Sequence, residues 1–243
     1  MGAWRQVIPA LDTDDLAQAC DWVELFKGRG PRIFKVGSQL FTRVGPKAVE
    51  EILDRGCGVF LDLKFHDIPN TAAQAARAAA ALGVTMFNVH ACGGKRMVRA
   101  AVEATLEEAA KKGLARPPLV LAVTVLTSLE EEDLRELGLC GEVRQWVTRW
   151  SQVALSAGVN GLVASAREVR ELRRELGEKL VLVSPGIRAK GAAPRDDQRR
   201  VAGPGWALEQ GADYLVMGRG LLEAEDPLGL LEEIEGPAQQ GRG

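Results

Sequence analysis

Eight short apolar segments rich in β-branched residues recur along the chain, and this repetition restricts the possible fold more than any other feature. They are residues 7–11, 33–36, 59–63, 84–89, 119–126, 161–164, 180–183 and 214–217. Each segment is almost continuously apolar, which is typical of a strand buried on both faces of a parallel sheet. The sequence between them shows helical spacing of apolar residues, as in Val143, Trp146, Val147 and Trp150.

Eight strands alternating with helices over 243 residues predict an α/β fold, a (β/α)8 TIM barrel. An open, doubly wound sheet is the alternative that the pattern alone allows. Its dinucleotide-binding form is disfavoured because no GxGxxG motif follows the first strand. Ser128 with Glu131, and Ser165 with Glu168, have the spacing of capping boxes at helix starts.

A single domain suits this length, because such barrels commonly run to about 250 residues. No low-complexity linker divides the sequence. We therefore expect a single (β/α)8 barrel domain over residues 1–235. Residues 236–243 lack periodicity and are expected to form a loose C-terminal tail.

Composition excludes several classes of function. Lys and Arg total 31 and Asp and Glu total 33, which argues against nucleic-acid binding through a bulk positive field. The apolar runs are too short to span a bilayer and the first residues lack an apolar signal core, so we expect a cytoplasmic location. The four cysteines form no CxxC pair and only His66 and His90 could assist them, which argues against a zinc site.

Charged residues follow the first three predicted strands, where a barrel carries its active site. The first strand ends in Asp12, the second carries Lys35 beside Gly37, and the third reads on through Asp62 and Lys64. Because strand side chains alternate between faces, Asp62 and Lys64 should share one face. The sequence predicts a cluster of alternating charges, which is either catalytic or a structural layer of ion pairs at the barrel rim.

The seventh and eighth strand ends carry glycine next to arginine, in Gly186-Ile187-Arg188 and Gly218-Arg219-Gly220. Barrels often bind phosphate at these two ends, through backbone N–H groups and arginine. The long polar stretch 189–203 could cover a phosphate with Gln198 and its neighbouring arginines, or it could be a surface loop. We expect His90 to be a hydrogen-bonded core residue and assign no role to His66.

The stretch Asp62-x-Lys64-x-x-Asp67-Ile68-Pro69-x-Thr71 resembles the signature of the orotidine 5′-monophosphate decarboxylase family, in its bacterial form. The resemblance extends over residues 12–221. Further matches occur in the same order as in the family: Lys35-Val36-Gly37, Leu126-Thr127-Ser128, Pro185-Gly186-Ile187-Arg188, Asp197-Gln198-Arg199-Arg200 and Gly218-Arg219.

The resemblance implies decarboxylation of orotidine 5′-monophosphate to UMP, the last step of de novo pyrimidine nucleotide synthesis, without metal or organic cofactor. It implies a catalytic network of Lys35, Asp62, Lys64 and Asp67, in which Lys64 stabilises and protonates the carbanion at C6. It also implies a homodimer with shared active sites, with Asp67 and Thr71 reaching into the partner's site.

The remaining substrate contacts are also implied by the resemblance. Asp12 and Lys35 would hold the ribose hydroxyls, and Thr127 and Ser128 would face the ribose and pyrimidine. The other expected substrate-binding residues, mostly around the 5′-phosphate, are Ile68, Pro185, Arg188, Gln198, Gly218 and Arg219.

Two alternatives remain from the sequence. Magnesium-dependent sugar-phosphate decarboxylases and aldolases share the barrel and the DxKxxD motif, but they carry a carboxylate where this chain has Lys35, and an ammonium cannot bind a hard cation. A non-catalytic barrel that binds a phosphate ligand is the second alternative, because fold alone does not establish catalysis.

Overall fold

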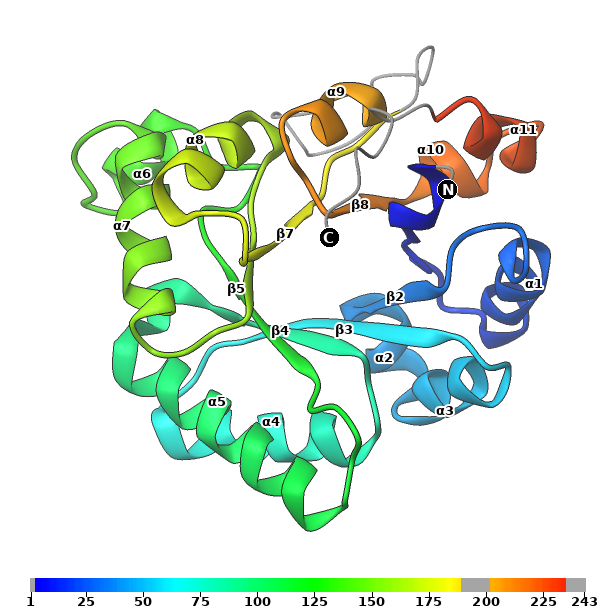
Figure 1. Cartoon of the computed structure of the whole chain (residues 1–243), viewed down its shortest axis with the longest axis horizontal. Helices are drawn as coiled ribbons and strands as arrows, with labels where there is room; N and C mark the ends of the chain where they lie inside the picture. Colours follow the sequence, from blue (N-terminus) through cyan, green and yellow to red (C-terminus); the bar gives the residue numbers. More distant parts are fainter. Residues whose placement is uncertain (1–2, 189–201, 235–243) are drawn as a thin grey trace.

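The computed structural model describes residues 3–188 and 202–234 and confirms the (β/α)8 barrel (Figure 1). Eight parallel strands form one sheet, in which β2 to β8 follow one another in chain order and β1 lies beside β8. The strands are β1 Val7–Pro9, β2 Ile33–Gly37, β3 Gly58–Phe65, β4 Met86–His90, β5 Leu119–Val123, β6 Gly161–Val163, β7 Val181–Ser184 and β8 Tyr214–Met217.

A bridge between Ala10 and Lys35 brings β1 against β2, and the Leu11 N–H donates to the Lys35 carbonyl at 3.0 Å. This contact closes the sheet and excludes the open, doubly wound alternative.

Helices surround the strands on the outside (Figure 1). They are the short η1 Ala3–Gln6 and η2 Ala91–Gly93, and then α1 Leu16–Phe26, α2 Ser38–Val44, α3 Lys47–Asp54, α4 Pro69–Ala81, α5 Gly94–Lys111, α6 Glu131–Glu136, α7 Val143–Leu155, α8 Ala166–Leu176, α9 Pro204–Glu209, α10 Arg219–Leu222 and α11 Pro227–Glu232. None of the helices in these described parts of the chain has the length and apolarity needed to cross a bilayer. The expected tail, residues 236–243, lies outside the described residues.

The helix starts test the two expected capping boxes. Ser165 is the N-cap of α8, its hydroxyl accepting from the Arg167 N–H, which confirms the N-cap part of the expected box with Glu168. The other expectation is wrong, because α6 begins at Glu131 with Glu130 as its N-cap. Glu130 forms a reciprocal box with Asp133, so an acidic residue does the capping and Ser128 lies in the preceding turn.

The interior of the barrel is filled by apolar side chains from alternating strand positions. This inner cluster consists of Ile8, Ala10, Phe60, Met86, Leu121, Val123, Val163, Val183 and Val216. A second, larger cluster lies between the strands and the helices. Asp62 comes two residues after Phe60 and Asn88 two after Met86, so both continue an inward-facing row above the apolar filling.

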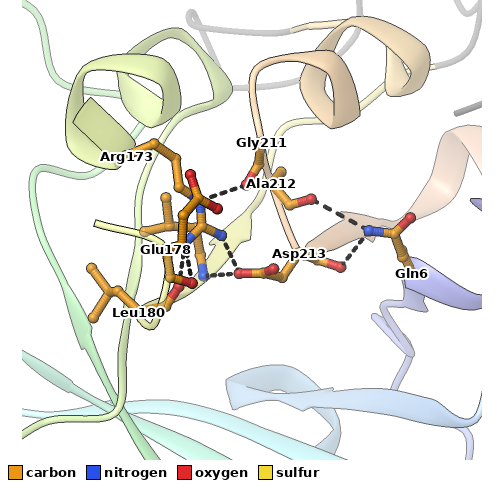
Figure 2. A network of polar contacts seen from close by, with 8 residues as sticks. Gln6, Arg173, Glu178, Leu180, Gly211, Ala212 and Asp213 are labelled. Atoms are coloured by element: carbon orange, nitrogen blue, oxygen red, sulfur yellow. Dashed lines mark hydrogen bonds and ion pairs between the residues drawn. The ribbon is translucent and has the colours of Figure 1, made fainter. Parts of the chain in front are cut away.

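A network around Arg173 of α8 lies at the amino-terminal ends of β7 and β8 (Figure 2). The side chain of Arg173 is 7% exposed and forms an ion pair with Asp213, which precedes β8. Its other N–H groups donate to the carbonyls of Gly211, Glu178 and Leu180. Asp213 also accepts from the Leu182 N–H at 2.8 Å, so this network joins α8 to both strands.

Candidate active site

The structure brings the four charged residues of the first three strand ends together in one cluster. The Lys35 ammonium lies 2.8 Å from Asp12 Oδ1 and 3.5 Å from Asp62 Oδ2. The Lys64 ammonium lies 2.7 Å from the other oxygen of Asp62, Oδ1. The charges therefore alternate in the order Asp12, Lys35, Asp62, Lys64, and Asp62 is bound between two ammonium groups.

Burial and charge act in opposite directions within this cluster. Burial favours the neutral amine of Lys35, but the carboxylates of Asp62 and Asp12 outweigh it and hold the pKa of Lys35 above its ordinary value. Burial would likewise raise the pKa of Asp62. Lys35 and Lys64, together with hydrogen bonds from Lys64 and Asn88, instead hold that pKa below its ordinary value. Lys35 and Asp62 therefore stay charged at neutral pH.

Gly37 is part of this arrangement because it leaves room for the Lys35 ammonium. A Cβ at position 37 would lie 2.8 Å from Lys35 Nζ and 3.2 Å from Asp12 Oδ1. Any larger residue here would displace the Lys35–Asp12 pair, which explains the Lys35-Val36-Gly37 sequence in physical terms.

The backbone at Lys64 departs from regular strand geometry. Pairing between β3 and β4 shifts from Leu61 opposite Phe87 to Phe65 opposite Val89, which marks an irregularity in β3. Lys64 has a φ of 52° and is the only non-glycine residue with a positive φ in residues 3–188 and 202–234. A residue held in this left-handed region stores about 1–3 kcal/mol of strain, and such strain is concentrated at functional sites.

Asn88 of β4 contacts both partners of the pair and was not expected to have a role. Its side chain is fully buried, accepts from the Lys64 N–H at 2.8 Å and donates to Asp62 Oδ1 at 2.7 Å. A polar residue at an inward-facing position of the apolar run Met86-Phe87-Asn88-Val89 was the signal that could have identified it.

Three of the expected residues beyond Lys64 lie at the surface of the described chain. Asp67, Ile68 and Thr71 are all exposed, and Ile68 is 66% exposed although it is apolar. The Asp67 carboxylate accepts from the Ile68 N–H at 2.6 Å. Among the described residues, Asp67 makes no ion pair with Lys35 or Lys64, so three of the four residues of the expected catalytic network are in contact here.

The other expected residues that the structure describes lie at the same, carboxyl-terminal end of the strands. Thr127 and Ser128 occupy a turn after β5 that is closed by the Leu129 N–H to Leu126 carbonyl bond. Pro185 and Arg188 follow β7, and Gly218 and Arg219 follow β8, where Arg219 begins α10. Gln198 lies outside the described residues, as does most of the stretch 189–203.

His90 and His66 form an aromatic pair beside the cluster, with ring centroids 5.4 Å apart. Burial, and then the neighbouring His66 and Lys64, lower the pKa of His90 to about 4, although Asp62 acts in the opposite direction. His90 is therefore neutral at physiological pH.

The donor set does not resemble a site for a hard cation. The carboxylates of Asp12 and Asp62 are the natural oxygen ligands at this position, but both already bind Lys35. Within residues 3–188 and 202–234, no group of three or more His, Cys, Asp and Glu side chains is placed to hold a metal ion.

Comparison with known proteins agrees with this geometry. A curated relative from Moorella thermoacetica, named orotidine 5′-phosphate decarboxylase, is 50% identical over 239 residues, covering 96% of this chain and 92% of that protein. A relative of the same name from Syntrophotalea carbinolica is 47% identical over 243 residues and covers 98% of each chain.

A solved structure and a family model complete the comparison. The crystal structure of orotidine 5′-phosphate decarboxylase from Lactobacillus acidophilus is 34% identical, with a TM-score of 0.79 over 94% of this chain and 96% of that one. The model of the orotidine 5′-phosphate decarboxylase / HUMPS family matches residues 5–234. The chain belongs to this family.

Proposed function

We propose that this chain is a carboxy-lyase that converts orotidine 5′-monophosphate to UMP, with Lys64 as the central catalytic group. The observation that carries the proposal is the Asp12, Lys35, Asp62, Lys64 cluster in a member of this family. The bond from C6 to the carboxylate breaks, carbon dioxide leaves, and the electron pair stays on C6. A proton then adds to C6 to give UMP.

Lys64 supplies both the charge and the proton in this scheme. Its side chain is 34% exposed, whereas that of Lys35 is 10% exposed, so Lys64 is the ammonium that a bound pyrimidine can approach. A fixed positive charge near C6 stabilises the developing carbanion more strongly once the substrate excludes water. Lys35 and Asp62 keep the cluster charged and ordered while Lys64 reacts.

The substrate would lie across several strand ends. Asp12 and Lys35 would hold the ribose hydroxyls, and Thr127 and Ser128 would face the ribose and pyrimidine. The phosphate would be bound by Arg188, Gly218 and Arg219, with Gln198 from outside the described residues, and with Pro185 and Ile68 lining the site. Binding energy from the remote phosphate can lower the chemical barrier at C6.

We further propose that two subunits complete each active site in a homodimer. The support is that Asp67, Ile68 and Thr71 are exposed just after Lys64, and that the family resemblance assigns Asp67 and Thr71 to the partner's site. In a two-fold dimer each subunit would lend its Asp67 to the other. The cytoplasmic location and the absence of a cofactor stay predictions.

The activity is tested by following the ultraviolet absorbance of orotidine 5′-monophosphate with EDTA present. We expect the absorbance to fall as UMP forms and EDTA to have no effect, because Lys35 occupies the carboxylates that a cation would need. Loss of turnover on chelation, with recovery on adding magnesium, would instead favour the magnesium-dependent alternative. Binding of the nucleotide without turnover would favour a non-catalytic barrel.

The shared site is tested by mixing two inactive variants, Lys64→Ala and Asp67→Ala. A mixed dimer has one site with both changes and one site with neither. Random exchange makes roughly half of the dimers mixed, so about a quarter of wild-type turnover should return under two-fold symmetry. If mixed dimers form and turnover stays at the level of the single variants, Asp67 serves its own subunit and the shared site is wrong.

A further inference from the structure

Asn88 is an uncharged, fully buried polar side chain that contacts two members of the charge cluster. It lies on the inward face of β4, opposite Leu121 of β5 and two residues beyond Met86. Its surroundings below are the apolar filling of the barrel, where an amide is unfavourable unless both its halves are hydrogen-bonded. Here both halves have partners, and these are Lys64 and Asp62.

The carbonyl half of Asn88 supports the irregular backbone of β3. Between Leu61 and Phe65 the regular pairing with β4 is interrupted, so the Lys64 N–H lies in the shifted segment. Asn88 Oδ1 accepts that N–H at 2.8 Å and takes the place of a strand carbonyl. The left-handed φ of 52° at Lys64 is thus held by a side chain of the neighbouring strand.

The amide half of Asn88 orients the Asp62 carboxylate. Asp62 Oδ1 accepts from both Asn88 Nδ2 and Lys64 Nζ, each at 2.7 Å. This leaves Oδ2 directed at the Lys35 ammonium, 3.5 Å away. A rotated carboxylate would lose one of these partners, so Asn88 selects the orientation in which each oxygen faces its own ammonium.

From these contacts we propose that Asn88 is a positioning residue for the decarboxylation, which sets both the backbone at Lys64 and the orientation of Asp62. It acts through Lys64 and Asp62 rather than on the substrate, and the inference rests on the function proposed above. Its removal should therefore slow the chemical step while leaving nucleotide binding largely intact, since phosphate and ribose contacts come from other strand ends.

The test compares Asn88→Ala with wild type in kcat, in KM and in the affinity for UMP. We expect kcat to fall about 100-fold or more, because preorganised catalytic groups lose efficiency steeply when misplaced. KM and the UMP affinity should change by less than about threefold. If folded Asn88→Ala keeps kcat within about threefold of wild type, the proposal is wrong. Equal losses in kcat, KM and UMP affinity would indicate a merely structural role and also overturn it.

Asn160 offers a matched control at the opposite end of the barrel. It lies just before β6, and its Oδ1 accepts from the Val120 N–H at 2.8 Å, the same kind of bond that Asn88 makes to Lys64. Asn160→Ala removes this bond far from the charge cluster. It should lower stability without changing kcat. A comparable fall in kcat for both variants would show that losing any such side-chain bond to a strand lowers kcat. Asn88 would then have no special role, and the proposal would be wrong.

Asn88→Asp tests the donor role of the amide apart from its acceptor role. It is also the variant to measure if Asn88→Ala fails to fold. It keeps the acceptor for the Lys64 N–H but places a second carboxylate against Asp62. Two adjacent carboxylates share a proton, so the acid limb of the kcat–pH profile should move up by about one pH unit or more. An unchanged profile would overturn the proposal, and a wild-type protein without decarboxylase activity would overturn the proposed function as well.

Discussion

The barrel has a buried ion-pair network at each end, and the two are built differently. At the amino-terminal end Arg173 and Asp213 are surrounded by backbone groups, and three carbonyls accept the remaining N–H groups of the guanidinium (Figure 2). At the carboxyl-terminal end Lys64 has one carboxylate partner among the described residues and a side chain that is 34% exposed. One network is saturated by the protein, whereas the other keeps an ammonium accessible.

This difference separates a structural ion pair from a reactive one. A buried charge is tolerated when every polar atom around it is paired, and Arg173 meets this condition. Lys64 combines a strained backbone with an incompletely surrounded ammonium, which leaves capacity for a substrate. The sequence allowed the charge cluster to be a purely structural layer of ion pairs. That description fits the network around Arg173 better than the cluster around Lys64.

The largest expected effect is the loss of catalysis in Lys64→Ala with little change in stability. Electrostatic stabilisation and proton donation by one group are each worth about 10²-fold or more, so kcat should fall by about 10⁴-fold or more. The free energy of unfolding should change by less than about 1 kcal/mol, because alanine keeps the left-handed backbone and its strain, and only a partly exposed ion pair is lost. Steady-state kinetics and urea unfolding measure the two quantities.

Lys27→Ala is the matched control for this variant. Lys27 also has one carboxylate partner at 2.7 Å, Glu24, and a similarly exposed side chain, at 40%. It should leave both kcat and stability almost unchanged. If Lys64→Ala instead unfolds the protein while kcat per folded molecule is preserved, the two ends of the barrel have the same structural role.

At the other end, Arg173→Met should destabilise the protein and leave the chemistry alone. It removes the charge that pairs with Asp213 and leaves the carbonyls of Gly211 and Leu180 without their donor. Breaking one side of a buried pair typically lowers the free energy of unfolding by about 3–5 kcal/mol. We expect the lower part of that range, because the Asp213 side chain is 27% exposed, and we expect kcat per folded molecule to be unchanged.

The neighbouring Arg174 makes the comparison specific. Its side chain is 75% exposed and lies 3.7 Å from Glu171, so Arg174→Met should change the free energy of unfolding by less than about 0.5 kcal/mol. Urea unfolding of the two variants measures the difference. Equal losses would mean that charge, rather than the saturated environment of Arg173, accounts for the stability.

The sequence predicted the barrel and the location of the site because both depend on short-range patterns. Apolar runs locate buried strands, and parallel strands bring their carboxyl ends to one side, so Asp12, Lys35 and Asp62 had to lie close together. The backbone conformation that places the Lys64 ammonium against Asp62 was not predicted. Regular alternation was assumed, whereas the structure has a shifted register and a left-handed residue.

The shifted register of β3 and the role of Asn88 both depend on tertiary contacts between β3 and β4. The register of β3 depends on which residue of β4 faces it, and a single polar residue in an apolar run does not reveal its partner. The Arg173 network was missed for a similar reason, because Arg173 and Asp213 are 40 residues apart in sequence. The carboxyl end of β5 was also placed too late, at residue 126, because apolar character continues into the turn after Val123.

The smallest expected effect concerns pH and again distinguishes the two ends. Both histidines of the chain lie beside the Lys64 cluster, and the pKa of His90 is lowered to about 4 by burial and by His66 and Lys64. An unfolded histidine binds its proton near pH 6.5. Between about pH 6.5 and 4 the unfolded chain therefore binds more protons at this residue than the folded chain does. The contribution of His90 to stability is complete above this window and is lost as the pH falls through it.

His90→Gln removes this titration and should flatten the pH dependence of the unfolding free energy between pH 6.5 and 4, relative to wild type. The difference should be about 1–2 kcal/mol across the window, after allowing for the partial exposure of the ring. Arg173→Met should lower the whole curve without changing this slope, because a guanidinium stays protonated throughout the range. Urea unfolding at several pH values measures both. A His90→Gln curve parallel to that of wild type would show that His90 binds protons equally in the folded and unfolded states. The loss of stability at low pH would then not originate from His90 at the carboxyl-terminal end of the barrel.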